Sequence, residues 1–255
     1  MNSVIFTLGF IEIRWYSILI LLGFVIGFLI VKSSCKKLEI PTSLIYDICF
    51  YITIFGIIGA RLYYCIFEYE YYSKNLLDIF KIWEGGLAIH GGIIAGLIVL
   101  LVYTKKTYAS YLTLLDIFAP ALVLGQAIGR WGNFFNQEAF GPVTTLSKLR
   151  SLHIPQFVID GMKINGEYHH PTFFYESLGC LIIFLIILIV KSIKKQTHGE
   201  LSGIYLILYG VLRFFIESLR QDSLMLFNFK IAQIVSIIMI IIGIEILIRT
   251  RWKNE

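Results

Sequence analysis

The chain has 255 residues, of which 57% are hydrophobic and 15% are charged. A mean hydropathy of +0.77 is too apolar for a soluble domain of this length, so the composition excludes a water-soluble enzyme and predicts a protein that crosses a membrane several times. The net charge is +5. The four cysteines are scattered and lack metal-ligand spacing, so we interpret them as small buried apolar side chains.

Apolar segments long enough to cross a bilayer recur along the whole chain. A membrane span needs about 20 predominantly apolar residues, with a range near 17–25. Seven segments approach this length, at 15–31, 44–66, 87–103, 112–129, 173–190, 201–217 and 230–248. We therefore predict an all-α polytopic membrane protein with seven transmembrane helices. Residues 1–3 carry no basic group and no small-residue cleavage site follows, so we expect the first helix to be a retained anchor.

Basic residues are concentrated after the first, third, fifth and seventh predicted spans. They are Lys32, Lys36, Lys37, Lys105, Lys106, Lys191, Lys194, Lys195, Arg249, Arg251 and Lys253. The positive-inside rule places such clusters in the cytoplasm. The pattern therefore predicts an N-terminus outside the membrane and a cytoplasmic C-terminus.

The longest segment between spans on the predicted outer side is 130–172. We expect one transmembrane domain over residues 1–255, with a small extracytoplasmic head containing some β structure inserted at 134–172. Within this head, segment 158–164 has β-prone residues on both sides of Asp160-Gly161, a pattern that predicts a β-hairpin.

A polar cluster follows the fourth apolar segment without a break. Arg130, Asn133, Asn136 and Glu138 come directly after closely spaced glycines and are interleaved with aromatic residues. An arginine at the centre of a bilayer costs about 2.5–3.5 kcal/mol on insertion scales. Such a cluster at the end of a membrane helix therefore indicates a functional site.

The sixth apolar segment carries a polar stripe. Tyr205, Tyr209, Arg213 and Glu217 recur at intervals of four residues, so they share one helical face, and Arg220 lies three residues further on. A polar stripe on an apolar helix must face protein or water rather than lipid. Two interpretations remain: an internal ion pair that only joins helices, or one wall of a polar cavity that opens to the outer leaflet.

Arg130 and Arg213 belong to different helices, and both lie toward the predicted outer side. Arginine binds phosphate through its planar fork of N–H donors. A polar cavity with two such groups beside lipid predicts a phospholipid headgroup as the substrate.

Two further polar residues lie in apolar segments. His90 is followed by two glycines in the first turns of the third predicted span, and its position on the outer side favours a functional over a structural role. Arg61 lies deep in the second predicted span. It could be a structural partner in an ion pair or could line a cavity.

The pattern Gly129-Arg130-x-Gly132-Asn133-Phe134-x-Asn136-x-Glu138-x-x-Gly141 resembles the signature of the bacterial prolipoprotein diacylglyceryl transferases. Other segments resemble that family in the same order along the chain. These are Trp15-Tyr16, His90-Gly91-Gly92, His170-Pro171-Thr172 with Tyr175-Glu176, and Tyr209-Gly210-x-x-Arg213 with Glu217 and Arg220.

The resemblance implies an enzyme of the bacterial cytoplasmic (inner) membrane with its active site toward the extracytoplasmic leaflet. Such an enzyme transfers the diacylglyceryl group of phosphatidylglycerol to the lipobox cysteine in the signal peptide of a prolipoprotein. A thioether forms and glycerol phosphate leaves. The expected partners are these two substrates and membrane lipid. The sequence has no metal site and no nucleotide-binding loop, so we expect no cofactor, no metal and no nucleic-acid partner.

The implied chemistry assigns roles to the polar residues. Arg130 and Arg213 would stabilise the negative charge that collects on the leaving phosphate, and Asn133 and Tyr16 would donate further hydrogen bonds. The other residues that we assign to substrate binding are Asn136, Glu138, Gly141, Glu217, Arg220 and Arg61. Of these, Glu138 and Glu217 would orient the arginines or the glycerol.

The attacking thiol also needs a base, because a free cysteine is only slightly ionised at neutral pH. His90 suits this role, since histidine exchanges protons readily near neutral pH. Tyr209, or the phosphate of the substrate, is the alternative.

Three other classes of protein remain to be distinguished. A transporter would also place arginine and glutamate in the membrane, although inverted repeats and broken helices near the midplane are typical of that class. A lipid headgroup hydrolase would use phosphatidylglycerol without an acceptor thiol. A lipid-binding protein would hold the headgroup without chemistry.

Overall fold

The structure is a computed structural model that describes residues 3–8, 11–38, 40–105, 110–193 and 197–252. Lys106, Lys194, Lys195 and Lys253, which contribute to the predicted topology, lie outside this described part. The chain forms two compact units. One consists of Met1–Ile30 with Asp116–Glu255, and the other is Val31–Leu115.

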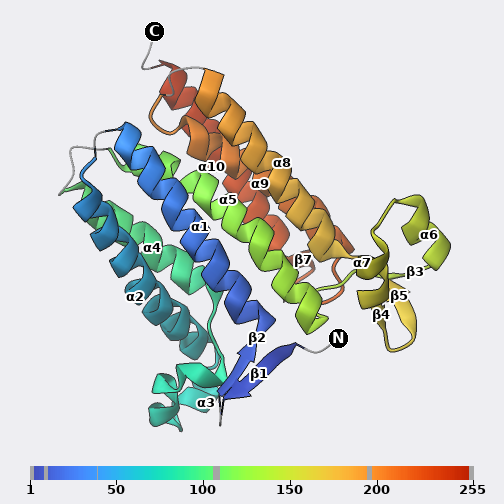
Figure 1. Cartoon of the computed structure of the whole chain (residues 1–255). Coiled ribbons are helices and arrows are strands. Elements are labelled where there is room, and N and C mark those ends of the chain that lie inside the picture. Colours follow the sequence, from blue (N-terminus) through green and yellow to red (C-terminus); the bar gives the residue numbers. More distant parts are fainter. Residues whose placement is uncertain (1–2, 9–10, 39, 106–109, 194–196, 253–255) are drawn as a thin grey trace. The chain divides into compact units, whose positions relative to one another are not determined.

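The chain is mostly helical, as predicted. The long helices of the first unit are the N-terminal part of α1 (Trp15–Lys37), most of α5 (Tyr111–Asn136), α8 (Thr172–Ile193), α9 (Glu200–Leu219) and α10 (Ile231–Trp252) (Figure 1). The antiparallel hairpins β1 (Val4–Leu8)–β2 (Ile11–Arg14) and β6 (Met225–Leu226)–β7 (Phe229–Lys230) precede α1 and α10. Short strands therefore accompany the helices at two of their ends.

Six helices in the described ranges are long and apolar enough to cross a membrane: α1, α2 (Thr42–Phe67), α5, α8, α9 and α10. This identifies a multi-pass membrane protein. The segment predicted as the third span forms the apolar helix α4 (Ile89–Thr104), which has 16 residues. A helix of that size is about 24 Å long, shorter than the roughly 30 Å hydrocarbon core of a bilayer.

The core of the first unit lies between α5, α8 and α9. Ala119, Val123 and Ala127 of α5 follow one another at four-residue spacing and are almost fully buried. They pack against Cys180 of α8 and Tyr205 of α9. Small side chains on α5 let the neighbouring helices approach closely, which brings the polar residues of three helices together at one end.

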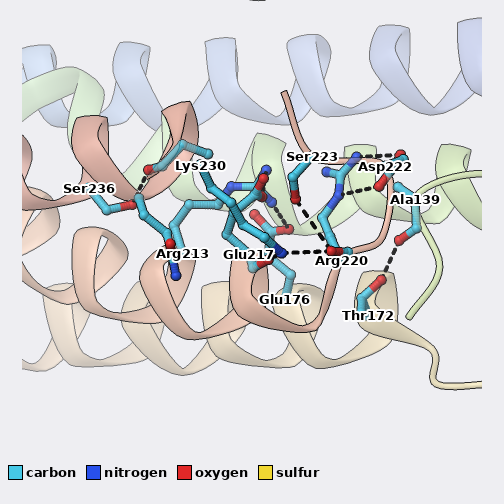
Figure 2. Close-up of polar contacts among 12 residues, drawn as sticks. Ala139, Thr172, Glu176, Arg213, Glu217, Arg220, Asp222, Ser223, Lys230 and Ser236 are labelled. Carbon is cyan, nitrogen blue, oxygen red and sulfur yellow. Dashed lines mark hydrogen bonds and ion pairs between the residues drawn. The ribbon is translucent and has the colours of Figure 1, made fainter. Parts of the chain in front are cut away.

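Buried polar contacts fix the two ends of α9. At its N-terminus, the Asp116 carboxylate of α5 accepts hydrogen bonds of 2.7 Å from the backbone N–H groups of Gly199 and Ser202. At its C-terminus, Lys230 Nζ donates to the carbonyl oxygens of Glu217 and Arg220, both at 2.7 Å (Figure 2). The helix that carries Arg213 is therefore held at both ends.

The head contains strands, as predicted, but the predicted hairpin at 158–164 is wrong. Residues Gln156–Gly161 form helix α7, which begins after Pro155. The actual hairpin joins β4 (Lys163–Ile164) to β5 (Glu167–His169) through Asn165-Gly166, whose φ angles are 51° and 91°. These left-handed conformations are typical of a two-residue hairpin turn.

The physical reason is that the apolar residues of this segment have helical rather than alternating spacing. Ile154, Val158, Ile159 and Met162 are all buried against Phe134 of α5. The head also contains α6 (Leu146–Ser151) and β3 (Val143–Thr144), which pairs with β5 to give a three-stranded sheet in the order β3-β5-β4.

The second unit is built on α2 and α4, which pack closely at two glycines. A side chain at Gly59 or at Gly91 would collide with the backbone of the other helix. The chain segment that connects α2 to α4 contains α3 (Tyr69–Tyr72) and the 3₁₀ turns Leu76–Phe80 and Ile82–Glu84.

Candidate active site

The Glu176 carboxylate of α8 joins the two arginines that the sequence analysis singled out. Arg130 Nη2 of α5 lies 2.9 Å from Glu176 Oε1, and Arg213 Nη1 of α9 lies 3.0 Å from Glu176 Oε2. Glu176 is 2% exposed, whereas the arginine side chains keep 21% and 15% of their surfaces accessible. The structure therefore brings both guanidinium groups to one buried anion while part of each stays open to a ligand.

Glu217 completes the ion-pair network on α9. Its Oε2 atom lies 2.6 Å from Arg213 Nη2, one helical turn away, so the ion pair of the first interpretation is present (Figure 2). The network of Arg130, Arg213, Glu176 and Glu217 contains two positive and two negative groups. Its formal charge is therefore balanced without a ligand.

Two tyrosines extend this network into the helical core. The Tyr209 hydroxyl donates a 3.1 Å hydrogen bond to Glu176 Oε1 and lies 3.5 Å from Arg130 Nη2. Its ring stacks on Tyr205, with centroids 5.6 Å apart, and Gln126 Nε2 donates to the Tyr205 hydroxyl at 2.9 Å. The polar stripe predicted on this helix therefore faces protein.

Ser177 fixes α8 against α5 next to the network. Its hydroxyl donates to the carbonyl oxygen of Ala127 at 2.9 Å and accepts from Trp131 Nε1 at 3.2 Å. The two bonded residues of α5, Ala127 and Trp131, flank Arg130 in the sequence. These bonds help to fix the position of Glu176 along α5, opposite Arg130.

The signature residues beyond Arg130 form a turn that ends α5. Glu138 Oε1 accepts hydrogen bonds from Asn133 Nδ2 at 2.8 Å and from Asn136 Nδ2 at 3.3 Å. Gln137 and Ala139 have φ angles of 51° and 56°, and the Ala139 carbonyl accepts a hydrogen bond from the Thr172 hydroxyl (Figure 2). Of the two glutamates predicted to orient the arginines or the glycerol, Glu138 therefore contacts two asparagines and Glu217 contacts Arg213.

Two further predicted residues lie near this turn. The Tyr16 ring of α1 packs directly on Gly132, where a larger residue would have no room. Gly141 donates its N–H to the His170 carbonyl at 2.9 Å and packs against the His170 side chain. Gly141 is thus required for close backbone packing.

Arg220 lies just after α9 and binds Asp222 through two bonds, from Nε to Oδ1 at 3.0 Å and from Nη2 to Oδ2 at 2.8 Å (Figure 2). These hydrogen bonds hold the pKa of Asp222 below its usual value. Arg220 is therefore part of a separate ion pair at the edge of the network.

Arg61 lies in the second unit and is 5% exposed. Its five N–H groups donate to the carbonyl oxygens of Asp78, Ile79, Lys81, Gly85 and Gly86. It also lines a pocket of about 340 Å³ with Tyr64, Glu68, Tyr71 and Tyr72. The guanidinium thus organises the segment 78–86, and substrate binding by Arg61 remains a prediction.

His90 also belongs to the second unit. It is the second residue of α4, and its ring lies 5.9 Å from that of Tyr63. Its role as a base remains a prediction.

His170 provides a pH-dependent test of the head. Its Nδ1 atom lies 3.1 Å from the Tyr175 hydroxyl, and burial together with the charge of Lys148 lowers the pKa of His170 from 6.5. As the pH falls below 6.5, the unfolded chain takes up this proton before the folded chain does, so stability should fall. The loss of stability should be complete once the pH is below the pKa of His170 in the folded chain. We expect His170→Gln to remove this component, and melting curves of both proteins from pH 8 to 5 would measure it. Parallel pH profiles would contradict the assignment.

Arg130, Arg213, Tyr209 and Glu217 were predicted site residues, whereas Glu176 had no predicted role. The available signal was an acid inside an otherwise apolar span, which needs a buried partner. Gln126, one turn before Arg130, gave the same kind of signal.

Comparisons with a family model and with individual proteins all point to the same family. Residues 3–249 match the family model described as Prolipoprotein diacylglyceryl transferase. A protein named phosphatidylglycerol–prolipoprotein diacylglyceryl transferase from Staphylococcus xylosus is 44% identical over 253 residues, or 99% of this chain and 90% of that protein. Proteins of the same name from Staphylococcus haemolyticus (strain JCSC1435) and Staphylococcus aureus (strain JH9) are 44% and 43% identical. They cover 98% and 99% of this chain, and the matches span 88% and 90% of their own lengths.

Proposed function

The chain belongs to the prolipoprotein diacylglyceryl transferase family, and on this premise we propose that it moves the diacylglyceryl group of phosphatidylglycerol to the lipobox cysteine of a prolipoprotein. The observation that carries the proposal is the convergence of Arg130 and Arg213 on one buried carboxylate. Two guanidinium groups held this way, at the end of a membrane helix bundle, suit a phosphate attached to a lipid.

The reaction forms a sulfur–carbon bond and breaks the carbon–oxygen bond to the phosphate. The electron pair of the broken bond leaves with glycerol phosphate, and the thiol proton goes to a base. The attack is on a saturated carbon, so the main electrostatic requirement is to stabilise the leaving phosphate. In the described part of the chain only Nη2 of Arg130 contacts another polar side chain, which leaves Nε and Nη1 as donors for that phosphate.

We assign the thiol proton to His90, with the substrate phosphate as the alternative acceptor. Tyr209 suits a base less well, because its hydroxyl already donates to Glu176. Its contacts support a role in holding the Glu176 carboxylate instead.

The remaining signature residues are proposed to bind the headgroup. Asn133, Asn136 and Glu138 form one hydrogen-bonded turn directly after Arg130, within reach of a ligand that extends beyond the arginines. Tyr16, packed on Gly132, would contribute its hydroxyl. The other proposed substrate-binding residues are Gly141, Glu217, Arg220 and Arg61.

We further propose seven membrane spans in one catalytic domain over residues 1–255, with α4 as the short third span and the head at 134–172 outside. The N-terminus would be extracytoplasmic and the C-terminus cytoplasmic. Support comes from Lys32 and Lys36 near the end of α1, Lys105 after α4, Lys191 in the last turn of α8 and Arg249 near the end of α10. This orientation would place the site in the outer leaflet of the bacterial inner membrane.

One assay tests the proposed function against the other classes. The full chain is incubated with vesicles containing phosphatidylglycerol and a lipobox peptide, and the peptide mass is measured. We expect the mass to increase by one diacylglyceryl group only when the peptide has its cysteine. Lipid breakdown without the cysteine would indicate a hydrolase. An unchanged peptide with unchanged lipid would contradict transferase activity.

A further inference from the structure

We infer that Glu176 is a positioning residue for the transfer reaction, which holds Arg130 and Arg213 at a fixed separation and offsets one of their two charges. This inference rests on the proposed function. Each oxygen of the carboxylate contacts one arginine, at 2.9 Å and 3.0 Å, so a single rigid group spans the gap between α5 and α9.

Contacts other than those with the arginines also hold Glu176 in place. The Tyr209 hydroxyl donates to Oε1, and the adjacent Ser177 is bonded to α5. The Glu176 side chain is 2% exposed, so solvent does not compete for its carboxylate oxygens. Glu176 is therefore the more enclosed partner, and it contacts Arg130 through Nη2 and Arg213 through Nη1.

The same contacts set the affinity for anions. Glu176 competes with a phosphate for two guanidinium groups, and Glu217 already binds Arg213. A site with balanced charge binds a phosphate less tightly than two unpaired arginines would, which allows the more highly charged glycerol phosphate to leave after transfer. Glu176 thus lowers the affinity of the site for phosphate, while it holds the two arginines at a fixed separation and favours product release.

Two substitutions separate charge from geometry. Glu176→Gln removes the negative charge at nearly constant shape, so we expect inorganic phosphate to bind about tenfold more tightly while turnover falls at least about tenfold. Glu176→Asp keeps the charge but is one methylene shorter and cannot reach both arginines. We expect turnover to fall by a similar factor with phosphate affinity close to that of the wild type.

The measurement is the melting temperature of the full-length protein in detergent as a function of inorganic phosphate concentration, with turnover measured on the same samples. Asp116→Asn is the matched control, because Asp116 is also a buried carboxylate that joins α5 to α9 but lies at the other end of α9. It should lower stability without changing the response to phosphate.

Equal or weaker phosphate binding by Glu176→Gln, or wild-type turnover by Glu176→Asp, would overturn the inference. If the wild-type chain transfers no diacylglyceryl group, the proposed function fails instead. The phosphate titration would still decide whether Glu176 restrains the two arginines.

Discussion

Arg130→Lys is expected to lower the rate of diacylglyceryl transfer by about 100-fold, which corresponds to about 2.7 kcal/mol of transition-state stabilisation. Lysine keeps the positive charge and could still pair with Glu176. It lacks the planar fork, so it cannot contact Glu176 and a phosphate oxygen with two fixed donors at once. The measurement is kcat/KM with phosphatidylglycerol vesicles and a lipobox peptide.

The matched control is Arg249→Lys. Arg249 forms an exposed pair with Glu245 on α10, at 2.5 Å, and belongs to no part of the site. The same chemical change there should leave transfer within about twofold of the wild type, because exposed ion pairs contribute little. Full activity of Arg130→Lys would remove the bidentate role of Arg130.

Arg61→Met is expected to lower the free energy of unfolding by about 3 kcal/mol. Methionine fills a similar volume but donates no hydrogen bond to the carbonyl oxygens of segment 78–86, which would lose their shared partner. Thermal unfolding in detergent measures the loss. Hydrogen exchange should increase in segment 78–86 more than in the helices.

Arg14→Met provides the comparison, since Arg14 is a half-exposed arginine that forms an ion pair with the nearby Glu12. It should change stability by less than about 0.5 kcal/mol. The pair of variants also separates the two roles considered for Arg61. Wild-type stability with weakened phosphatidylglycerol binding in Arg61→Met would favour substrate contact over a structural role.

Much of the helical architecture follows from the sequence because membrane spans leave a strong signal. Six predicted apolar segments correspond to helices of spanning length, and the polar stripe on α9 contains the Arg213–Glu217 pair that was one of its two interpretations. The head was harder to predict. Asp160-Gly161 is a frequent turn pair, but here the buried spacing of Val158, Ile159 and Met162 favours a helix, and the turn lies at Asn165-Gly166.

The site was only partly predictable for a related reason. Sequence spacing shows which residues share one helix face, so it could relate Tyr209, Arg213 and Glu217. It could not show that an acid on α8 would meet both α5 and α9, because that contact depends on how three helices pack. Only the structure shows that Glu176 contacts both Arg130 and Arg213.

Arg130 and Arg213 are proposed to bind the phosphate of phosphatidylglycerol together. The most direct measurement is an experimental structure of the full chain bound to that lipid. We expect phosphate oxygens about 2.7–2.9 Å from a guanidinium nitrogen of each arginine, with Glu176 still between them. A phosphate that contacts neither arginine, or only one of them, would contradict this proposal.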